Sequence, residues 1–282
     1  MEKPIRVVEL FAGVGGFRLA LEQASSRFQT VWANQWEPSM KTQFAYECYV
    51  KHFGAKKEHV CADIKNAKSQ IPPHDLLVGG FPCQDYSIAK RNPQGIEGKK
   101  GILWWEIDSI LYEHRPSYVL LENGFPQRRR RTFIFAYHND TQLFRNAADD
   151  ICICGLKGAH KQVTRDGFFA PIFPLSSHGQ TYTEGWLDEF AFFDMKELSD
   201  SQRSRFYNTG LMVNGRYYSV EGIPSRRVPT SLGRIIEDGV IDEQYYLTES
   251  TMPRWRYVKG AKQELRHRKD GTRYIFSEGA VP

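Results

Sequence analysis

The sequence lacks any run of apolar residues long enough to cross a membrane, and residues 1–4 lack the apolar stretch of a secretory signal. Cysteine is scarce as well. There are 5 cysteines among 282 residues, and an odd, scattered set does not suit a disulfide framework. We therefore expect a cytoplasmic protein in a reducing compartment. The net charge of +5 is compatible with nucleic acid but does not require it.

A third glycine is missing from the motif that would bind a dinucleotide. An apolar, β-branched segment at 5–11 is followed by glycines and by a helical pattern over 18–23. This order of strand, glycine turn and helix is typical of a site for a nucleotide-containing cofactor. The dinucleotide fingerprint requires glycine where Arg18 stands, three residues after Gly15. The sequence thus disfavours a pyrophosphate and favours a cofactor with a carboxylate, such as S-adenosylmethionine.

Acidic residues follow two further predicted strands. Glu37 comes after the segment 29–33, where a doubly wound fold places the acid that binds a ribose, and Trp36 beside it could pack on an adenine. Glu37 could instead begin a helix near Pro38. Asp63 follows another short apolar segment and suits an adenine amino group. An aspartate that caps a helix would look the same in sequence.

Cys83 is the candidate nucleophile. It lies in a turn-like stretch, 79–87, directly after the apolar segment 76–78, which we predict to be a buried strand of a parallel sheet. A thiol at the carboxyl end of such a strand can be tuned toward thiolate by nearby cations or a helix N-terminus. Free cysteines are more often small buried hydrophobes. The proline before Cys83 and the polar residues after it make a core position less suitable.

A carboxylate and a run of arginines follow the next predicted strand. Glu122 ends the apolar segment 118–121, and a carboxylate at that end of a buried strand seldom serves packing. Four arginines occupy 128–131. Such a run is more often a solvated or phosphate-contacting patch than four catalytic groups, and in a strand only alternate arginines would face one site.

Together these motifs resemble those of the bacterial DNA cytosine-5 methyltransferases, and the combination is more specific than any single part. The resemblance implies an α/β fold: a Rossmann-like, S-adenosylmethionine-dependent methyltransferase sheet with a smaller, irregular target-recognition domain. The segments that carry it are Phe-Ala-Gly-Val-Gly-Gly at 11–16, Asp-Ile at 63–64, Gly-Phe-Pro-Cys-Gln-Asp-Tyr-Ser at 80–87, the stretch 98–106, Leu-Leu-Glu-Asn at 120–123, and Gly-Phe-Pro-Gln with four arginines at 124–131.

The resemblance implies methyl transfer from S-adenosylmethionine to carbon 5 of a flipped cytosine in duplex DNA, in restriction–modification or a related system. Cys83 would add to carbon 6 of the base. Glu122 would hold N3 and the exocyclic amine, while Arg131, with Arg129, would fix O2 and the neighbouring backbone. No metal is implied. The cofactor contacts carried over are Phe11, Gly13, Gly15, Gly16, Trp36, Glu37, Asp63, Ile64, Phe81 and Pro82. A strict register would put Gln35 in the place of Glu37.

The chain departs from the family in two places. Family members ordinarily have several dozen residues, with another helix and strand, where Asn123 here adjoins Gly124. Two parallel strands need a crossover of about a dozen residues or more. Either the sequence omits part of the natural chain, which we favour because the motifs on both sides read as undamaged, or the protein is a deletion form with a compromised fold. The family's late motifs are also absent, so a second polypeptide could supply them.

The resemblance assigns residues 1–136 to a catalytic and cofactor-binding domain and 137–282 to a target-recognition region. Within the second region, 208–218 predicts two short strands around an Asn-Gly turn. The basic stretch 265–273 suits phosphates or guanine edges, although a solvated charge cluster fits equally well. Cys152 and Cys154 with His160 could suggest a metal, but an apolar strand in the core is the better interpretation.

Three other functions are compatible with parts of the sequence. A binding-only subunit, inactive until a partner is added, would share the cofactor loop. A nicotinamide-dependent oxidoreductase is disfavoured because Arg18 replaces the required glycine and because Cys83 and Glu122 would have no role. An RNA-methylating branch shares the same fold, and competition between DNA and tRNA substrates would separate the two.

Overall fold

The computed structural model describes residues 3–38, 40–80, 102–122, 132–175, 181–187, 206–225, 239, 248–253, 264–267 and 273–276. Contacts divide the chain into two units, of which the larger comprises Met1–Phe125 with Arg130–Ser225 and the smaller comprises Pro126–Arg129 with Arg226–Pro282. The predicted division at residue 136 is a functional one and stays a prediction. None of the described helices is long and apolar enough to cross a membrane.

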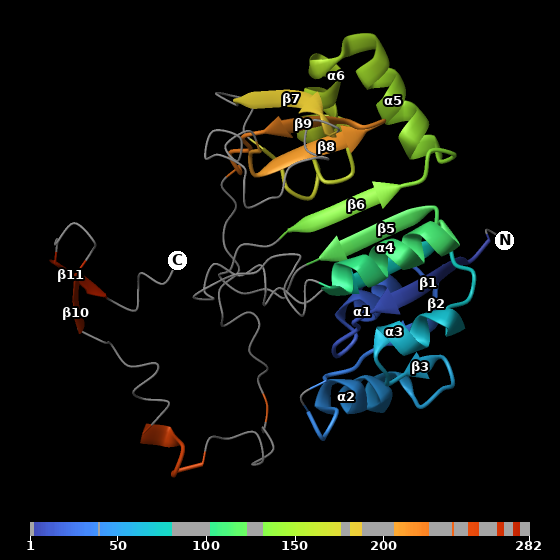
Figure 1. Ribbon diagram of the computed structural model, residues 1–282, viewed down its shortest axis with the longest axis vertical. Helices are drawn as coiled ribbons and strands as arrows, with labels where there is room; N and C mark the ends of the chain where they lie inside the picture. Colours follow the sequence, from blue (N-terminus) through green and yellow to red (C-terminus); the bar gives the residue numbers. More distant parts are fainter. Residues whose placement is uncertain are drawn as a thin grey trace. The chain divides into compact units, whose positions relative to one another are not determined.

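A six-stranded sheet lies at the centre of the larger unit, in the order β3-β2-β1-β4-β5-β6 (Figure 1). The first five strands pair in parallel and β6 is antiparallel to β5. This topology confirms the predicted α/β sheet, and a strand occurs at each of the five apolar segments described above. The strands are β1 (Ile5–Leu10), β2 (Phe28–Asn34), β3 (His59–Val60), β4 (Leu76–Gly80), β5 (Tyr118–Glu122) and β6 (Phe133–Tyr137).

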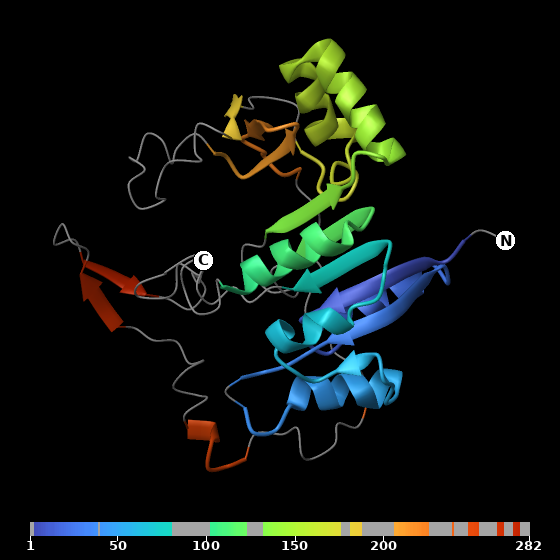
Figure 2. The same cartoon turned by 45° about the vertical axis from the view of Figure 1, so that its right-hand side comes forward.

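Helices cover both faces of this sheet, because alternate residues of each buried strand point to opposite sides. On one face, Val8 and Leu10 of β1 pack with α3 (Ile64–Ala67) and α4 (Ile102–His114) in the larger core cluster. On the other face, Val7 and Val78 pack with α1 (Gly16–Ala24). In the turned view, the strands coloured from blue to green form one continuous row (Figure 2).

The last strand corrects a premise of the sequence analysis. The crossover argument assumed that the strands on either side of the Asn123–Gly124 junction are parallel. β6 instead runs antiparallel to β5, with Glu122 opposite Phe133 in the register. An antiparallel neighbour can be joined by a short connection, so the chain as it stands needs no crossover at this point.

A second sheet follows in the same unit, in the order β7-β9-β8. The predicted strand pair is confirmed: β8 (Thr209–Val213) and β9 (Arg216–Val220) flank a turn in which Asn214 and Gly215 both have positive φ. Tyr218 of β9 packs against Ile151 and Ala159 of the preceding helices. The remaining elements are β7 (Tyr182–Trp186), α5 (Gln142–Cys154), α6 (Leu156–Lys161) and the π-turn η3 (Gln162–Asp166). The smaller unit contains the hairpin β10 (Glu264–His267) and β11 (Arg273–Phe276).

The predicted apolar strand around Cys152 and Cys154 is wrong. Both cysteines lie in the last turn of α5 and are exposed. Thr141 caps this helix by accepting a hydrogen bond from the Phe144 amide, and Ala147 and Ile151 form its buried stripe at i, i+4 spacing. The alternation of Ile and Cys therefore masked a helical period. Among the described residues no group of His, Cys, Asp and Glu could hold a metal ion.

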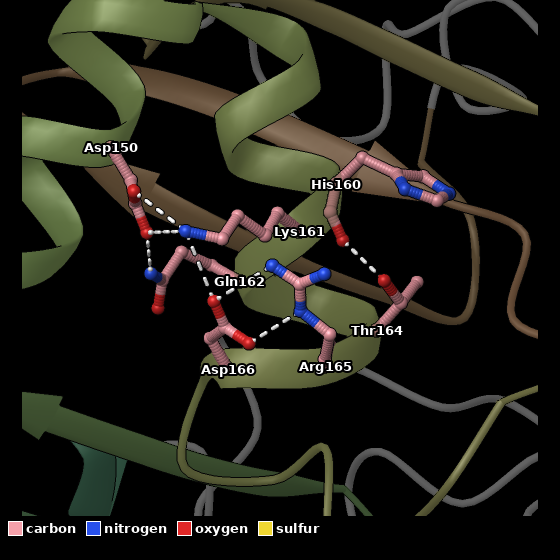
Figure 3. A network of polar contacts seen from close by, with 7 residues as sticks. All are labelled: Asp150, His160, Lys161, Gln162, Thr164, Arg165 and Asp166. Atoms are coloured by element: carbon pink, nitrogen blue, oxygen red, sulfur yellow. Dashed lines mark hydrogen bonds and ion pairs between the residues drawn. The ribbon is translucent and has the colours of Figure 1, made fainter.

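Ion pairs hold α5 against α6 and η3 (Figure 3). Lys161 Nζ lies 2.9 Å from Asp150 Oδ1 and 3.1 Å from Asp166 Oδ2, and Gln162 donates to Asp150 at 2.6 Å. These bonds hold the pKa of the half-buried Asp150 carboxyl below its usual range, the Lys161 bond most of all. Because water and salt reach this partly exposed pair, the charges alone contribute little to the contact.

We expect Gly158→Ala to destabilise the protein, although alanine is the better helix former. A Cβ at this position would meet the Asp150 carbonyl oxygen at 2.1 Å, so α5 and α6 would have to move apart. The loss should be about 1–3 kcal/mol. Chemical unfolding of Gly158→Ala and of the exposed control Asn146→Ala measures it. Equal or greater stability of Gly158→Ala would contradict the observed helix contact.

Candidate active site at the carboxyl edge of the sheet

The carboxyl ends of the five parallel strands lie along one edge of the central sheet. The connection after β1 leads to β2 on one side of the β1–β4 pair, and the connection after β4 leads to β5 on the other side. Such a switch point is where open α/β sheets bind ligands. The strand ends are also bonded to one another. The Ala12 amide donates to the Asn34 carbonyl at 2.8 Å, and the Asn34 side chain donates to the Ala62 carbonyl at 2.8 Å. The predicted site residues thus come from five neighbouring segments.

The predicted cofactor loop follows β1 and leads into α1. Gly13 and Gly15 have φ values of +56° and +93°, and Phe11 is also left-handed at 52°. These conformations explain the need for glycine, since side chains make them costly. A Cβ on Gly13 would meet no atom of the described residues within 4 Å, whereas one on Gly15 would clash with the Phe53 ring of α2 (Phe44–Phe53). Gly16 is the first residue of α1.

Gln35, the residue after β2, contacts this loop directly. Its side-chain Oε1 accepts a hydrogen bond of 2.7 Å from the Gly13 amide. Trp36 is 38% exposed and Glu37 is half-buried. Glu37 does not begin a helix, because α2 starts only at Phe44 and the Glu37 backbone is bonded to the Gln43 side chain. Glu37 and Trp36 therefore stand at the edge where the ribose and adenine contacts are predicted, and whether Glu37 or Gln35 takes the place of the family's acid stays a prediction.

Asp63 and Ile64 follow β3. Asp63 is the N-cap of α3, and its Oδ1 accepts from the Lys65 amide at 3.0 Å. The capping alternative is therefore correct for this oxygen, while Oδ2 accepts no hydrogen bond within the described part of the chain. Ile64 is 2% exposed and packs in the core, so its side chain supports the site from below.

The predicted catalytic residues lie around the ends of β4 and β5. Glu122 is half-buried at the end of β5 and is paired in register with Gly80, the last residue of β4. Cys83 follows Gly80 by three residues in the sequence. Cys83 itself lies outside the described residues, as do Phe81, Pro82, Arg129 and Arg131. For these five the roles given above stay predictions.

A buried polar cluster beneath the cofactor loop was not predicted from the sequence. Glu9 of β1 is fully buried, with Oε1 accepting from the Arg18 amide at 3.3 Å and Oε2 accepting from the Tyr49 hydroxyl at 3.1 Å. The Arg18 guanidinium donates to Tyr49 and lies 2.9 Å from His59 Nε2. It also bonds Glu22 at 2.7 Å and covers the Phe53 ring. The only signal in the sequence was a glutamate inside an apolar strand.

Burial dominates the electrostatics of this cluster. It raises the pKa of the Glu9 carboxyl to about 7, against the opposing effects of the Tyr49 hydrogen bond and Arg18. Burial also lowers the pKa of His59, and the Arg18 charge acts in the same direction. The Nδ1 of His59 lies 2.8 Å from the Gly54 carbonyl, which assigns the proton to Nδ1 and leaves Nε2 to accept from Arg18. The cluster therefore gains or loses a proton near neutral pH at Glu9.

Comparisons with known proteins agree with the family that the motifs indicate. The family of C-5 cytosine-specific DNA methylases matches residues 5–123. The type II methyltransferase M.Sau3AI of Staphylococcus aureus is 34% identical over 322 residues, covering 98% of this chain and 76% of its own. M.HhaI of Haemophilus parahaemolyticus is 31% identical over 176 residues, covering 49% of this chain and 51% of its own. M.NgoBI of Neisseria gonorrhoeae is 36% identical over 247 residues, covering 87% and 62%.

Among solved structures, the Dnmt2 methyltransferase of S. pombe covers 90% of this chain and 67% of its own, at 18% identity and a TM-score of 0.37. That likeness is too loose to place residues. The sequence alignments show how the length of this chain compares with that of its relatives. The 322 aligned positions of M.Sau3AI exceed the 282 residues of this chain, so at least 40 positions (322 less 282) lie opposite gaps. M.HhaI shows a similar excess of about 38 (176 less 49% of 282), whereas M.NgoBI shows almost none.

The buried carboxyl gives a pH-dependent stability. Because the folded-state pKa of Glu9 lies above its unfolded value, folding favours the protonated form. The stabilisation is complete below about pH 4.5 and is lost as the pH rises to about 7, a decrease of about 3 kcal/mol in the free energy of unfolding. Chemical unfolding across this range should show that decrease in the wild type and in Glu22→Gln. It should be absent in Glu9→Gln, and an unchanged dependence in Glu9→Gln would assign it to other groups.

Proposed function

The chain belongs to the family of C-5 cytosine-specific DNA methylases, and we propose on that premise how its residues share the methylation of cytosine at carbon 5 in DNA. It is a DNA (cytosine-5-)-methyltransferase of the restriction–modification type. The observation that carries this function is the match of 98% of the chain to one type II methyltransferase, of which it covers 76%. The order of the strand ends supports it, because it gathers the family's motifs at one edge.

S-adenosylmethionine is the methyl donor we propose for the loop after β1. When bound, it supplies an electrophilic methyl group. The open space over Gly13 and the left-handed backbone there provide a cradle that a side chain would fill. Gln35 holds this cradle through the Gly13 amide. Glu37 would accept hydrogen bonds from the ribose hydroxyls, Trp36 would pack on the adenine, and Oδ2 of Asp63, the oxygen that does not cap α3, would accept from the adenine amine.

Cytosine activation is assigned to the ends of β4 and β5. Carbon 5 of cytosine is a weak nucleophile, so the thiolate of Cys83 would add to carbon 6 and make carbon 5 enamine-like. Glu122 would share its proton with N3 and offset the charge that develops on the ring. The in-register pairing of Gly80 with Glu122 supports this arrangement, since it brings the nucleophile's strand and the carboxylate together. Arg131 and Arg129 would fix O2, and loss of the carbon 5 proton would release Cys83.

Duplex DNA is the proposed substrate. Carbon 5 and carbon 6 cannot be reached inside a stacked helix, so the target base must be flipped into the site. We propose that residues 137–282 read the DNA. The described hairpin around Asn214 and Gly215 supports this role, and so do the lysine and arginines in the sequence 265–273, since such side chains suit phosphates and base edges.

A binding-only subunit of a split enzyme is not favoured. Most of the chain aligns with one polypeptide, and a second polypeptide has no support in the comparisons. The hypothesis that the natural chain is longer is supported by the alignments. In two of the three, about 40 positions of the relative have no counterpart here. We propose that those residues belong between Asn123 and Gly124. An intact mass of 32.6 kDa for the natural protein would overturn this.

Covalent trapping tests the chemistry. Fluorine at carbon 5 cannot leave as a cation, so an active enzyme should stay attached to duplex DNA that contains 5-fluorocytosine when S-adenosylmethionine is present. We expect a stable adduct on denaturing gels with the wild type and with Cys61→Ser, whose thiol is exposed. Cys83→Ser should give none. DNA and cofactor binding without any wild-type adduct would point to a binding-only protein.

Two glycine variants test the cofactor loop. Gly13→Ala should keep the fold at a cost of about 1–2 kcal/mol, because φ is positive but the space is open. Its methyl group should nevertheless obstruct the ligand and weaken S-adenosylmethionine binding at least tenfold, about 1.4 kcal/mol. Gly15→Ala should lower the melting temperature much further, because its Cβ would meet Phe53. Calorimetric titration and thermal melts measure both effects, and unchanged affinity in Gly13→Ala would remove the ligand from this loop.

A further inference from the structure

We propose that Glu9 is a positioning residue for the cofactor loop, and that the loop holds its ligand well only while the Glu9 carboxylate is ionised. This inference rests on the proposed function, because it takes the ligand to be S-adenosylmethionine. Glu9 does not touch the ligand in this scheme. It acts through the backbone of α1 and through an aromatic ring of α2.

The first link joins the two ends of the loop. Glu9 is the second-last residue of β1, and the Arg18 amide belongs to the first turn of α1. The loop between them contains the left-handed Gly13 and Gly15. Gly15 is the N-cap of α1 and has no side chain to accept from the helix amides, so the Glu9 carboxylate serves that purpose from the sheet. An anion is also favoured at this end of a helix dipole.

The second link holds two aromatic rings of α2 against the loop. The Tyr49 hydroxyl donates to the other Glu9 oxygen, and Tyr49 is 1% exposed. A Cβ on Gly15 would meet the Tyr49 ring at 3.1 Å and the Phe53 ring at 2.2 Å. These rings therefore lie directly against the loop backbone. The bond between Tyr49 and Glu9 fixes how closely α2 can approach it.

Both links need the ionised form, because two donors point at the two oxygens of Glu9. A protonated carboxyl must donate through one of its oxygens and would lose a hydrogen bond there. The Tyr49 hydroxyl oxygen can accept this proton, but its own hydrogen then needs another acceptor. The Arg18 guanidinium has only donors, and the Nε2 of His59, which could accept, is occupied by Arg18. Protonation thus leaves the hydrogen of the buried Tyr49 hydroxyl without an acceptor among the described residues of the cluster, which weakens the hold of Glu9 on the Tyr49 ring.

The titratable and charged groups that face this carboxylate come from three elements: Arg18 and Glu22 from α1, Tyr49 from α2 and, across the guanidinium, His59 from β3. The register neighbours on either side, Ala33 and Val78, are apolar. With burial raising the pKa of Glu9 to about 7, its charge changes within the range in which the enzyme would work. Cofactor affinity should therefore follow the ionisation of one buried group.

Calorimetric titration of S-adenosylmethionine between about pH 6 and pH 8 tests the inference. The wild-type affinity should fall up to about tenfold for each unit below pH 7. Glu9→Gln can accept from the Arg18 amide but cannot satisfy Tyr49 in the same way, so its affinity should be weak and independent of pH. Steady-state assays should show the same change in the KM for the cofactor, with kcat little altered. Glu22→Gln, which removes an exposed partner of Arg18, should keep the wild-type slope, with the midpoint moved to slightly lower pH because the Glu22 charge contributes to raising the pKa of Glu9.

Tyr49→Phe provides the second variant, in case Glu9→Gln fails to fold. Removing the hydroxyl deletes a bond that lowers the pKa of Glu9, so the midpoint of the affinity profile should move to higher pH. A wild-type profile without pH dependence, or a folded Glu9→Gln with the wild-type slope, would overturn the inference. If the wild type binds no S-adenosylmethionine at any pH, the proposed function fails, and the inference fails with it.

Discussion

Parallel pairing of five strands is the constraint on which the rest of this structure depends. It sends every carboxyl strand end to the same edge, so segments that are far apart in sequence must meet there. The glycine loop after β1, Gln35 after β2, Asp63 after β3 and Glu122 at the end of β5 are neighbours for this reason alone. Short hydrogen bonds between the segments after the strands, such as the one that the Gly13 amide donates to Gln35, then set the distances within the group.

The same edge of the sheet contains a fully buried carboxyl group, that of Glu9. A neutral side chain at Glu9 would avoid the loss of hydration that the carboxylate suffers in the sheet. Glu9 is tolerated because two donors and a guanidinium surround it, and because Tyr49, Arg18 and His59 satisfy one another in turn. Such a cluster orders the elements it joins more sharply than apolar packing would, since each bond has a direction. Because glycine has no side chain that could hold the loop in place, the cluster beneath the loop is what keeps its backbone in position.

Much of this arrangement can be predicted from the sequence, and the exceptions have physical causes. Short apolar segments between glycines and prolines gave β1, β4 and β5, because buried parallel strands read as continuous apolar runs. The Asn-Gly pair gave the turn between β8 and β9, because only such residues accept two positive φ values. The segment at Cys152 was mistaken for a strand because a two-residue alternation hid the helical spacing of Ala147 and Ile151. Tyr49 could not be linked to Glu9, nor His59 to Arg18, since contacts 40 and 41 residues apart leave no local pattern.

The antiparallel pairing of β5 and β6 has a consequence for the evolution of this chain. Glu122 and Phe133 lie opposite each other, so the two ends of the connection are already close whatever its length. The entropy of closing a loop grows only slowly with the number of residues in it. Residues added between Glu122 and Phe133 would therefore cost the described sheet little, whatever their number. A catalytic edge built from strand ends can in this way stay in place while the connection between its last two strands varies in length.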